Sequence, residues 1–536
     1  MVPSLVRQAP PPPDYYARNL RFLLDAVAAQ SGDLLTADER GFLQAFQGAS
    51  TSAQRLFARL LTRSGRWLRI DSLNYAEVGD RDRALAELRG AGLAVLTPDA
   101  PADALLRLLT RPELAALFPR VRARTKPQWI AECVGRYGDR QIRARVAARH
   151  PWVEVGYGHA FAVCQVLFFG GDRQDLSTFV LQDLGIRRYE RYPLSPDTRP
   201  FEQRGELDRY LSCRRLAPWV ERLEQMPQLA TALCCALVPP AQSRIEQRTR
   251  DRILNQVGRW HERRGEWQQA LQSYQHATSH PARERRARIL RRLGDEAAVA
   301  ALLTEIRADP WAPEEQDFAR RFAGVRPAPG ARVSELRLAA ATPGAIERHA
   351  IDVLTANGGC GWHLENQLPL GLAGLAFWPQ IFAAVKGAFS HPFQLGPRDL
   401  FWPDFARTRA AVLAARIRAL EAPGAFEHQV REVYAAKYGT ANRLVHWGAI
   451  TPEVLDGLLG NVCHRALLRL AAYTVANLGR ARAGFPDLLL VYGRAAWELV
   501  EVKGPTDQLQ PAQRVWLAAL HELQIPVRVL RFRAAC

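Results

Sequence analysis

Asp487, Glu501 and Lys503, near the C-terminal end of the sequence, have side-chain types and a spacing suited to a divalent-cation site. Asp487 follows Pro486 at the start of the apolar stretch "DLLLVY", and Glu501 and Lys503 lie in "WELVEVKGP". Side chains alternate along a strand, so Glu501 and Lys503 are expected on one face. A hairpin brings Asp487 close to Glu501. Two adjacent carboxylates repel unless a hard cation lies between them, which predicts Mg²⁺ or Mn²⁺, with the Val502 carbonyl as a further oxygen ligand.

Lysine is rare in this chain, which makes Lys503 informative. Of the 72 basic residues only four are lysines, so wherever any cation serves, the sequence uses arginine. A lysine in an apolar strand therefore indicates a need for a compact ammonium that orients or deprotonates water and stabilises a phosphate transition state. A bare Glu-x-Lys is common on solvated strand faces. The upstream Pro-Asp, the apolar flanks and the Gly-Pro that ends the strand favour a functional site over that interpretation.

The elements that position these residues are expected to form a small α/β core. Its expected elements are a helix in "AIERHAIDVLTANGG", one long helix over 451–478, the hairpin, a helix over 511–523 and a strand over 526–532. The rest is expected to be mainly α-helical. The predicted domains are 1–100 (helical, winged-helix-like), 101–150 (SAP-like, DNA-binding), 151–325 (helical, TPR-like) and 345–536 (the α/β core).

Two observations support the helical assignments. Thr36 and Glu39 have the spacing of a capping box at a helix start. Leu254, Gly258, His261, Gly265, Ala270, Tyr274 and Ala277 match one tetratricopeptide-type unit, with no clear second copy.

The Pro-Asp…Glu-Val-Lys pattern matches the PD-(D/E)XK nuclease superfamily. The stretch "GFPDLLLVYG" with "WELVEVKGPTDQLQPAQRVWLAAL" resembles its VRR-NUC branch. In that branch a glutamine on the following helix, here Gln513, belongs to the motif, and the resemblance implies that it holds the lysine or a metal-bound water. An exposed helical glutamine without a function is the alternative.

The resemblance extends beyond this core to most of the chain. The stretches "NYAEVGDRDRALAELRGAGL" and "LFFGGDRQDLSTFVLQDLGIRRYERY", with the SAP-like and TPR-like parts, resemble the Fanconi-associated nuclease family, in a bacterial layout. This implies a structure-selective 5′-flap endonuclease with 5′-to-3′ exonuclease activity that acts in interstrand-crosslink repair. It adds Glu365 to Asp487, Glu501 and Val502 as ligands of one or two ions. Animal members begin with a ubiquitin-binding zinc finger, whereas no cysteine precedes Cys133 here, so no ubiquitin recognition is implied.

The net charge of +18 and the pI of about 10.0 favour a polyanionic partner, which is nucleic acid or an anionic membrane surface. No apolar run is long enough for a membrane span and no signal peptide is expected, so we expect a cytoplasmic protein that acts at the nucleoid. The eight cysteines never form Cys-x-x-Cys, which argues against structural zinc and disulfides. The predicted DNA contacts are Arg480, Arg482, Arg248, Arg252, Arg259 and Arg263.

Two other functions remain open from the sequence. One is a junction-resolving nuclease with the same core, which the long helical region disfavours. The other is a non-catalytic DNA-repair scaffold, which an intact set of Asp487, Glu501 and Lys503 disfavours.

Overall fold

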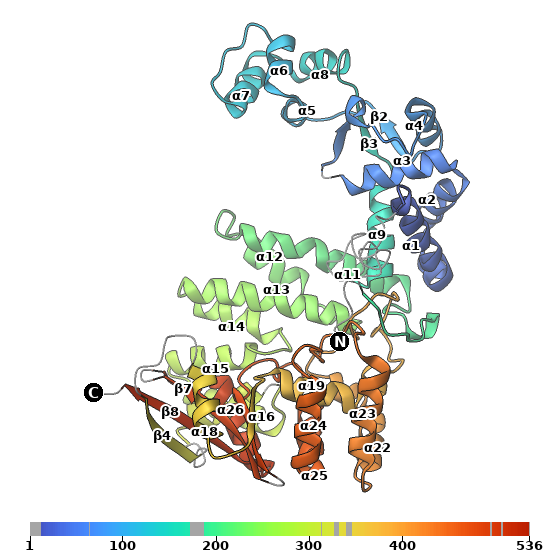
Figure 1. Ribbon diagram of the computed structural model, residues 1–536. Helices are drawn as coiled ribbons and strands as arrows, with labels where there is room; N and C mark the ends of the chain where they lie inside the picture. The colour runs from blue at the N-terminus through green and yellow to red at the C-terminus, as the bar shows by residue number, and fades with distance from the viewer. Residues whose placement is uncertain are drawn as a thin grey trace. The chain divides into compact units, whose positions relative to one another are not determined.

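The computed structural model describes residues 12–63, 65–171, 187–311, 313–325, 332–338, 346–493, 496–504 and 507–534 (Figure 1). These residues divide into two compact units. The first contains the described residues up to Arg188 with Leu194–Arg199, and the second contains Tyr189–Pro193 and the described residues from Pro200 onward. Within the described residues, no helix combines the length and the apolar character that a membrane span needs.

The N-terminal unit combines helices with a small antiparallel sheet of order β1-β3-β2. The predicted capping box is present, since Thr36 accepts from the Glu39 amide and the Glu39 carboxylate accepts from the Thr36 amide. The elements are α1 (Tyr15–Ser31), α2 (Ala37–Gly48), α3 (Thr51–Thr62), β1 (Trp67–Arg69), α4 (Arg81–Gly90), β2 (Ala94–Leu96), β3 (Trp152–Val155) and α9 (Gly158–Phe169).

Strands β1 and β2 both lie in the segment that the sequence predicts to be winged-helix-like, but they do not pair with each other. Between them lies β3, which pairs antiparallel with both β1 and β2. In addition, α9 packs against α1 and α2. The domain boundary that we predicted between residues 150 and 151 therefore does not match the packing, because β3 and α9 complete the N-terminal unit.

Residues 102–147 form an insertion of four short helices between β2 and β3. Its buried side chains, such as Leu105, Phe118 and Trp129, make one hydrophobic cluster that also includes Trp152 of β3. The helices are α5 (Ala102–Leu108), α6 (Arg111–Leu117), α7 (Lys126–Arg136) and α8 (Asp139–Ala147).

The helical part of the second unit contains the TPR-like pair that the sequence predicts, α13 and α14. A Cβ on Gly258 of α13 would lie 2.8 Å from the Tyr274 ring of α14, so glycine is what permits this close approach. A second helical hairpin, α15 and α16, follows although its sequence shows no clear repeat. The helices are α11 (Arg204–Leu216), α12 (Leu229–Ala236), α13 (Arg244–Arg263), α14 (Trp267–Gln275), α15 (Ala282–Arg292), α16 (Glu296–Ala308) and α17 (Pro313–Phe322).

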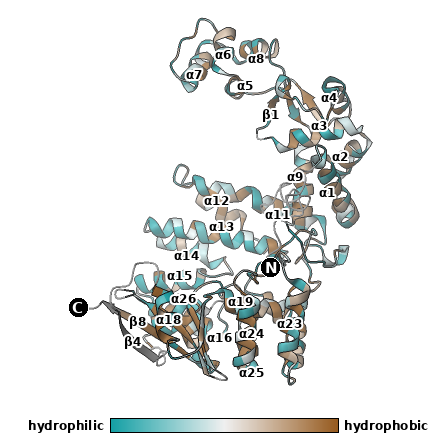
Figure 2. Cartoon of the chain, viewed as in Figure 1, coloured by the Kyte–Doolittle hydropathy of each residue, from teal (hydrophilic) through white to brown (hydrophobic). Residues whose placement is uncertain are grey.

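The C-terminal part is built on a five-stranded mixed sheet of order β4-β8-β7-β6-β5. Strands β4, β8 and β7 are parallel, and β7-β6 and β6-β5 are antiparallel. The middle strands have mostly hydrophobic colours, in contrast to α13 and α14 (Figure 2). Helix α18 packs on one face through Ala350. The elements are β4 (Arg332–Leu338), α18 (Ile346–Leu354), β5 (Cys360–His363), β6 (Leu488–Gly493), β7 (Ala496–Lys503), α26 (Pro511–Glu522) and β8 (Val527–Ala534).

Helices connect β5 to β6, and here one prediction is wrong. The long helix expected over 451–478 is two helices, because Val462 has extended backbone and Cys463 is also non-helical. The His464 ring contacts the Leu459 carbonyl across this break. The helices are α19 (Gln367–Ala376), α20 (Trp378–Ile381), α21 (Phe405–Thr408), α22 (Ala410–Leu420), α23 (Ala425–Lys437), α24 (Pro452–Asn461) and α25 (His464–Ala476). The predicted fold class, mainly helical with a C-terminal α/β core, is confirmed.

Candidate active site

The β6-β7 hairpin brings Asp487 beside Glu501, as the strand pattern predicts. Leu488 of β6 lies opposite Val500 of β7. Asp487, the residue before β6, therefore lies next to Glu501 and Val502. The Val502 amide donates a 2.7 Å hydrogen bond to Asp487 Oδ2. This bond fixes the Asp487 carboxylate at the end of the hairpin.

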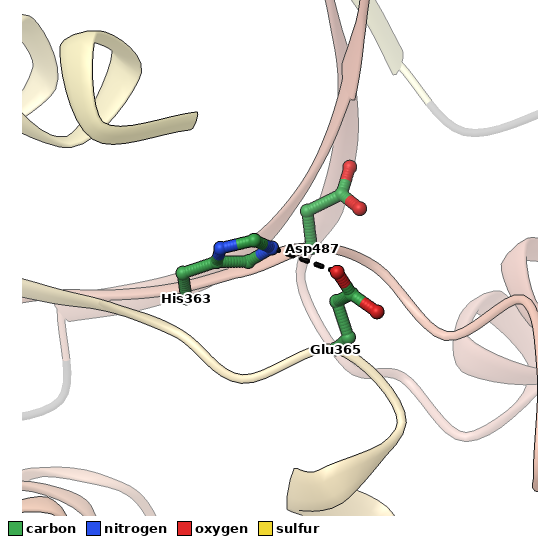
Figure 3. A group of neighbouring side chains, drawn as sticks. All are labelled: His363, Glu365 and Asp487. Atoms are coloured by element: carbon green, nitrogen blue, oxygen red, sulfur yellow. Dashed lines mark hydrogen bonds and ion pairs between the residues drawn. The ribbon is translucent and has the colours of Figure 1, made fainter. Parts of the chain in front are cut away.

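Glu365 joins this pair from a distant part of the sequence. The amides of Leu364 and Glu365 both donate to the Asp487 carbonyl, at 3.0 and 3.2 Å. Glu365 has a φ of +45°, a left-handed conformation that costs a non-glycine residue on the order of 1 kcal/mol. The two backbone hydrogen bonds hold this conformation, which turns the Glu365 carboxylate toward Asp487 (Figure 3).

Glu501 is almost fully buried, with 1% of its surface exposed. Its Oε1 accepts from Gln513 Nε2 at 2.6 Å and lies 3.0 Å from Lys503 Nζ. Within the described part of the chain, its Oε2 has no hydrogen-bond partner. Burial and the charge of Asp487 together raise the Glu501 pKa to about 7, against the opposing effect of Lys503. A buried oxygen without a donor needs an explanation, and a cation beside it supplies one.

The pKa of the Asp487 carboxyl is shifted by the same environment as that of Glu501. Burial raises its pKa, the Val502 amide opposes that shift, and the Glu365 charge adds to it. Three mutually destabilising carboxylates at the end of one sheet form a donor set that fits a divalent cation.

Lys503 lies on the same face of β7 as Glu501, as strand alternation predicts. It is 8% exposed, and its ammonium lies 3.0 Å from Glu501 Oε1. The site therefore places one buried ammonium directly beside the carboxylates.

Gln513 contacts Glu501, whereas the family resemblance implies that it holds the lysine or a metal-bound water. Its Nε2 donates to Glu501 while its Oε1 accepts from the Gln510 amide at 2.8 Å, so both ends of the amide are engaged. The start of α26 comes close because Gly484 has a φ of +87° and no side chain: a Cβ there would lie 2.6 Å from the Ala512 carbonyl carbon. Gln513 is thus a link between α26 and β7.

His363 also belongs to this group, although the sequence analysis did not single it out. Its Nε2 lies 2.9 Å from Glu365 Oε1. Ligand atoms of His363, Glu365 and Asp487 all lie within 4.8 Å of one another (Figure 3). The signal in the sequence is His-Leu-Glu, whose alternation at a strand end places the two polar side chains on one face.

The structure separates the predicted DNA-contacting arginines into two kinds. Arg480 is engaged within the protein, since its guanidinium pairs with Glu314 and donates to the Trp311 carbonyl. It therefore links α17 to the segment before β6. Its guanidinium is not free for the DNA contact that the sequence predicts. Arg482 is exposed and stacks over the Phe401 ring at 4.8 Å. The other four are exposed on one side of α13: Arg248, Arg252, Arg259 and Arg263.

The raised pKa of Glu501 predicts a pH-dependent instability of the metal-free protein. The folded-state value of about 7 exceeds the ordinary 4.5, so stability from this group is present below pH 4.5 and lost as the pH rises to about 7. The full difference corresponds to about 3 kcal/mol. Glu501→Gln cannot ionise, so in EDTA we expect its stability relative to wild type to increase between pH 5 and pH 8. Urea denaturation at both pH values measures this.

The control for this measurement is Glu522→Gln, an exposed glutamate on α26. Its stability relative to wild type should be the same at both pH values. A Glu501→Gln difference that also stays constant would show that Glu501 titrates normally.

Comparisons with known proteins agree with this site. The model of the FAN1 HTH domain matches residues 14–95, and that of the VRR-NUC domain matches residues 422–534. The second match includes Asp487, Glu501, Lys503 and Gln513 but begins after Glu365. A VRR-NUC domain implies dependence on a divalent metal ion.

Relatives match nearly the whole chain. The Fanconi-associated nuclease 1 homolog of Pseudomonas aeruginosa is 32% identical over 98% of this chain and 96% of its own. The Arabidopsis thaliana homolog is 26% identical over 98% of this chain and 68% of its own. A crystal structure of paFAN1 bound to 2-nt 5′-flap DNA with a gap has a TM-score of 0.84 and 30% identity, covering 99% of this chain and 100% of that one. The chain is a DNA nuclease and belongs to the Fanconi-associated nuclease family.

Proposed function

We propose that this nuclease cleaves 5′-flap and related branched DNA endonucleolytically, with 5′-to-3′ exonuclease activity, during interstrand-crosslink repair in the cytoplasm of a bacterium. The observation that carries the proposal is the meeting of Glu365, Asp487, Glu501 and Lys503 at one end of the sheet. The similarity to paFAN1, which was crystallised with 5′-flap DNA, supports the choice of substrate.

The metal centre in this proposal consists of Glu365, Asp487, Glu501 and the Val502 carbonyl, holding one or two Mg²⁺ or Mn²⁺ ions. All of these donors are oxygens, which these ions prefer, and the partnerless Glu501 Oε2 supports the fit. When bound, a cation of this kind polarises the scissile phosphate and lowers the pKa of a water molecule.

The protein's own groups orient this chemistry. The Val502 amide holds Asp487, and Gln513 holds Glu501, so the carboxylates are positioned before substrate arrives. Lys503 places a positive charge and a proton-carrying Nζ beside Glu501. There it orients the attacking water, takes part in its deprotonation and stabilises the negative charge that develops on the phosphate.

Helix α13 supplies the second part of the proposal, a basic stripe for the DNA backbone. Arg248, Arg252, Arg259 and Arg263 are separated by four, seven and four residues, so they share one helix face. Arg248 also stacks over Trp402, 4.7 Å from its ring centroid. Arg252, Arg259 and Arg263 make no ion pair with any residue that the structure describes, so their charges are available to phosphates.

The SAP-like insertion offers a further basic surface in the N-terminal unit. A hollow of about 700 Å³ is lined by Arg111, Arg122, Arg124 and Trp129, among others. Several guanidinium groups beside an aromatic ring suit contacts to a phosphate backbone. We propose that it grips the duplex, so that recognition of structure rests on contacts outside the catalytic core.

We expect the double variant Arg252→Gln/Arg259→Gln to weaken the salt dependence of DNA binding. Each lost phosphate contact reduces the magnitude of the slope of log K against log salt by about 1. The slope of the double variant should therefore be smaller in magnitude by up to about 2. Fluorescence anisotropy with a labelled flap in Ca²⁺ between 50 and 200 mM salt, roughly the range over which such contacts show, measures the slope. The charge-matched control is Arg320→Gln/Arg418→Gln, which removes two exposed arginines outside the stripe. Equal slopes for the two double variants would refute the stripe.

The substrate assignment is tested with a panel of end-labelled DNAs. It contains a 5′ flap, a 3′ flap, a four-way junction, a nicked duplex and a single strand, each with Mg²⁺ or EDTA. We expect the 5′ flap to be cut fastest, only with the metal. Preference for the four-way junction would favour a resolving nuclease, and binding without any cleavage would favour a scaffold.

A further inference from the structure

His363 ends β5 directly beside the proposed metal centre. Leu364 between His363 and Glu365 is 4% exposed, so it points into the core while both polar neighbours point out toward the site. The His363 side chain is 43% exposed, so its imidazole reaches the site from the solvent side.

The spacing of its nitrogen fits a ligand position. His363 Nε2 and Glu365 Oε1 are 2.9 Å apart. Two adjacent ligands of an octahedral ion with bonds of about 2.1 Å are about 3.0 Å apart. The same separation therefore fits two situations. Without a metal the two atoms form a hydrogen bond, and with a metal they can be neighbouring ligands of one cation.

No other cluster in the described residues repeats this arrangement. His428 pairs with Glu432 on the surface of α23, and His280 pairs with Glu284 at the start of α15, so each of these histidines has a single carboxylate. His363 instead lies with two carboxylates from separate segments, and this is the one trio of potential ligands found in the described part of the chain. A second carboxylate at this distance is what distinguishes a ligand set from a surface ion pair.

We propose that His363 is a nitrogen ligand of the divalent cation and that it shifts the selectivity of the site from Mg²⁺ toward Mn²⁺. This inference rests on the metal centre proposed above. Mg²⁺ is a hard ion that prefers oxygen and keeps its waters, whereas imidazole raises affinity for transition metals. A site with three carboxylates and one imidazole therefore binds Mn²⁺ more tightly than the oxygen ligands alone would.

The test of His363 compares three variants of the full-length, DNA-free protein with wild type, and Asp487→Asn and Glu501→Gln test the metal centre itself. His363→Gln keeps an amide able to donate to Glu365 but removes the imidazole nitrogen, and His363→Ala removes both. The control is His428→Gln, an exposed histidine beside one glutamate. Pulsed electron paramagnetic resonance of the Mn²⁺-loaded protein reports a directly bound nitrogen, and calorimetric titration gives the Mn²⁺ and Mg²⁺ affinities.

We expect wild type and His428→Gln to show nitrogen coupling to Mn²⁺, and both His363 variants to lack it. His363→Gln should bind Mn²⁺ about 10-fold more weakly and Mg²⁺ nearly as well as wild type. Nitrogen coupling that survives in His363→Gln, or equal losses for both metals, would overturn the proposal and leave His363 as a residue that only positions Glu365. Mn²⁺ binding that survives Asp487→Asn and Glu501→Gln unchanged would instead refute the metal centre itself.

Discussion

Asp487→Asn is expected to cut a 5′ flap at least about 10³-fold more slowly than wild type under single-turnover conditions with Mg²⁺. The amide still accepts from the Val502 amide, so the hairpin keeps its geometry, but the negative charge that attracts the cation is lost. A factor of 10³ corresponds to about 4 kcal/mol, which is within what a metal ion contributes to transition-state stabilisation.

The matched control for this variant is Asp352→Asn, which changes an exposed aspartate on α18 of the same domain. It should cleave at the wild-type rate. If Asp487→Asn retained more than about a tenth of the wild-type rate, Asp487 would not belong to the catalytic metal centre.

Lys503→Arg is expected to reduce the single-turnover rate by about 10²-fold or more, although the charge is unchanged. Lys503 is buried and its Nζ lies 3.0 Å from Glu501 Oε1, so the larger planar guanidinium has no room to reproduce the contact. Arginine also cannot release a proton near neutral pH, whereas lysine can when its environment favours it. DNA affinity in Ca²⁺ should barely change, because the carboxylates remain.

Lys386→Arg provides the comparison for Lys503→Arg. Lys386 also pairs with a glutamate, Glu202, but on the protein surface with 49% of its side chain exposed. An arginine fits such a pair, so cleavage should be unaffected. If Lys503→Arg were as active as Lys386→Arg, the buried lysine would act only as a positive charge.

The local part of the site was predictable from the sequence. Asp487, Glu501 and Lys503 lie on one hairpin, where a two-residue alternation and the pairing of adjacent strands determine which side chains meet. The family motif added Gln513, but the sequence could not tell which partner its amide contacts. That depends on how closely α26 approaches Gly484, which is a tertiary distance.

The distant part of the site was not predictable from spacing. Glu365 lies 122 positions before Asp487, and its left-handed backbone depends on hydrogen bonds to the Asp487 carbonyl. The same limit explains β3, which pairs with strands more than fifty positions earlier in the sequence. Arg480 illustrates the converse: a basic residue near a nuclease motif suggests a DNA contact until the structure shows Glu314 beside it.

The central claim, that one metal-dependent site around Asp487 cleaves flap DNA, is tested most directly by a single measurement. Wild type and Asp487→Asn are mixed with a labelled 5′ flap in EDTA, and excess Mg²⁺ is then added to both complexes. We expect no cleavage before the addition, rapid cleavage by wild type afterwards with 5′-phosphate and 3′-hydroxyl ends, and almost none by the variant. Cleavage in EDTA, or equal rates for the two proteins after Mg²⁺ is added, would contradict it.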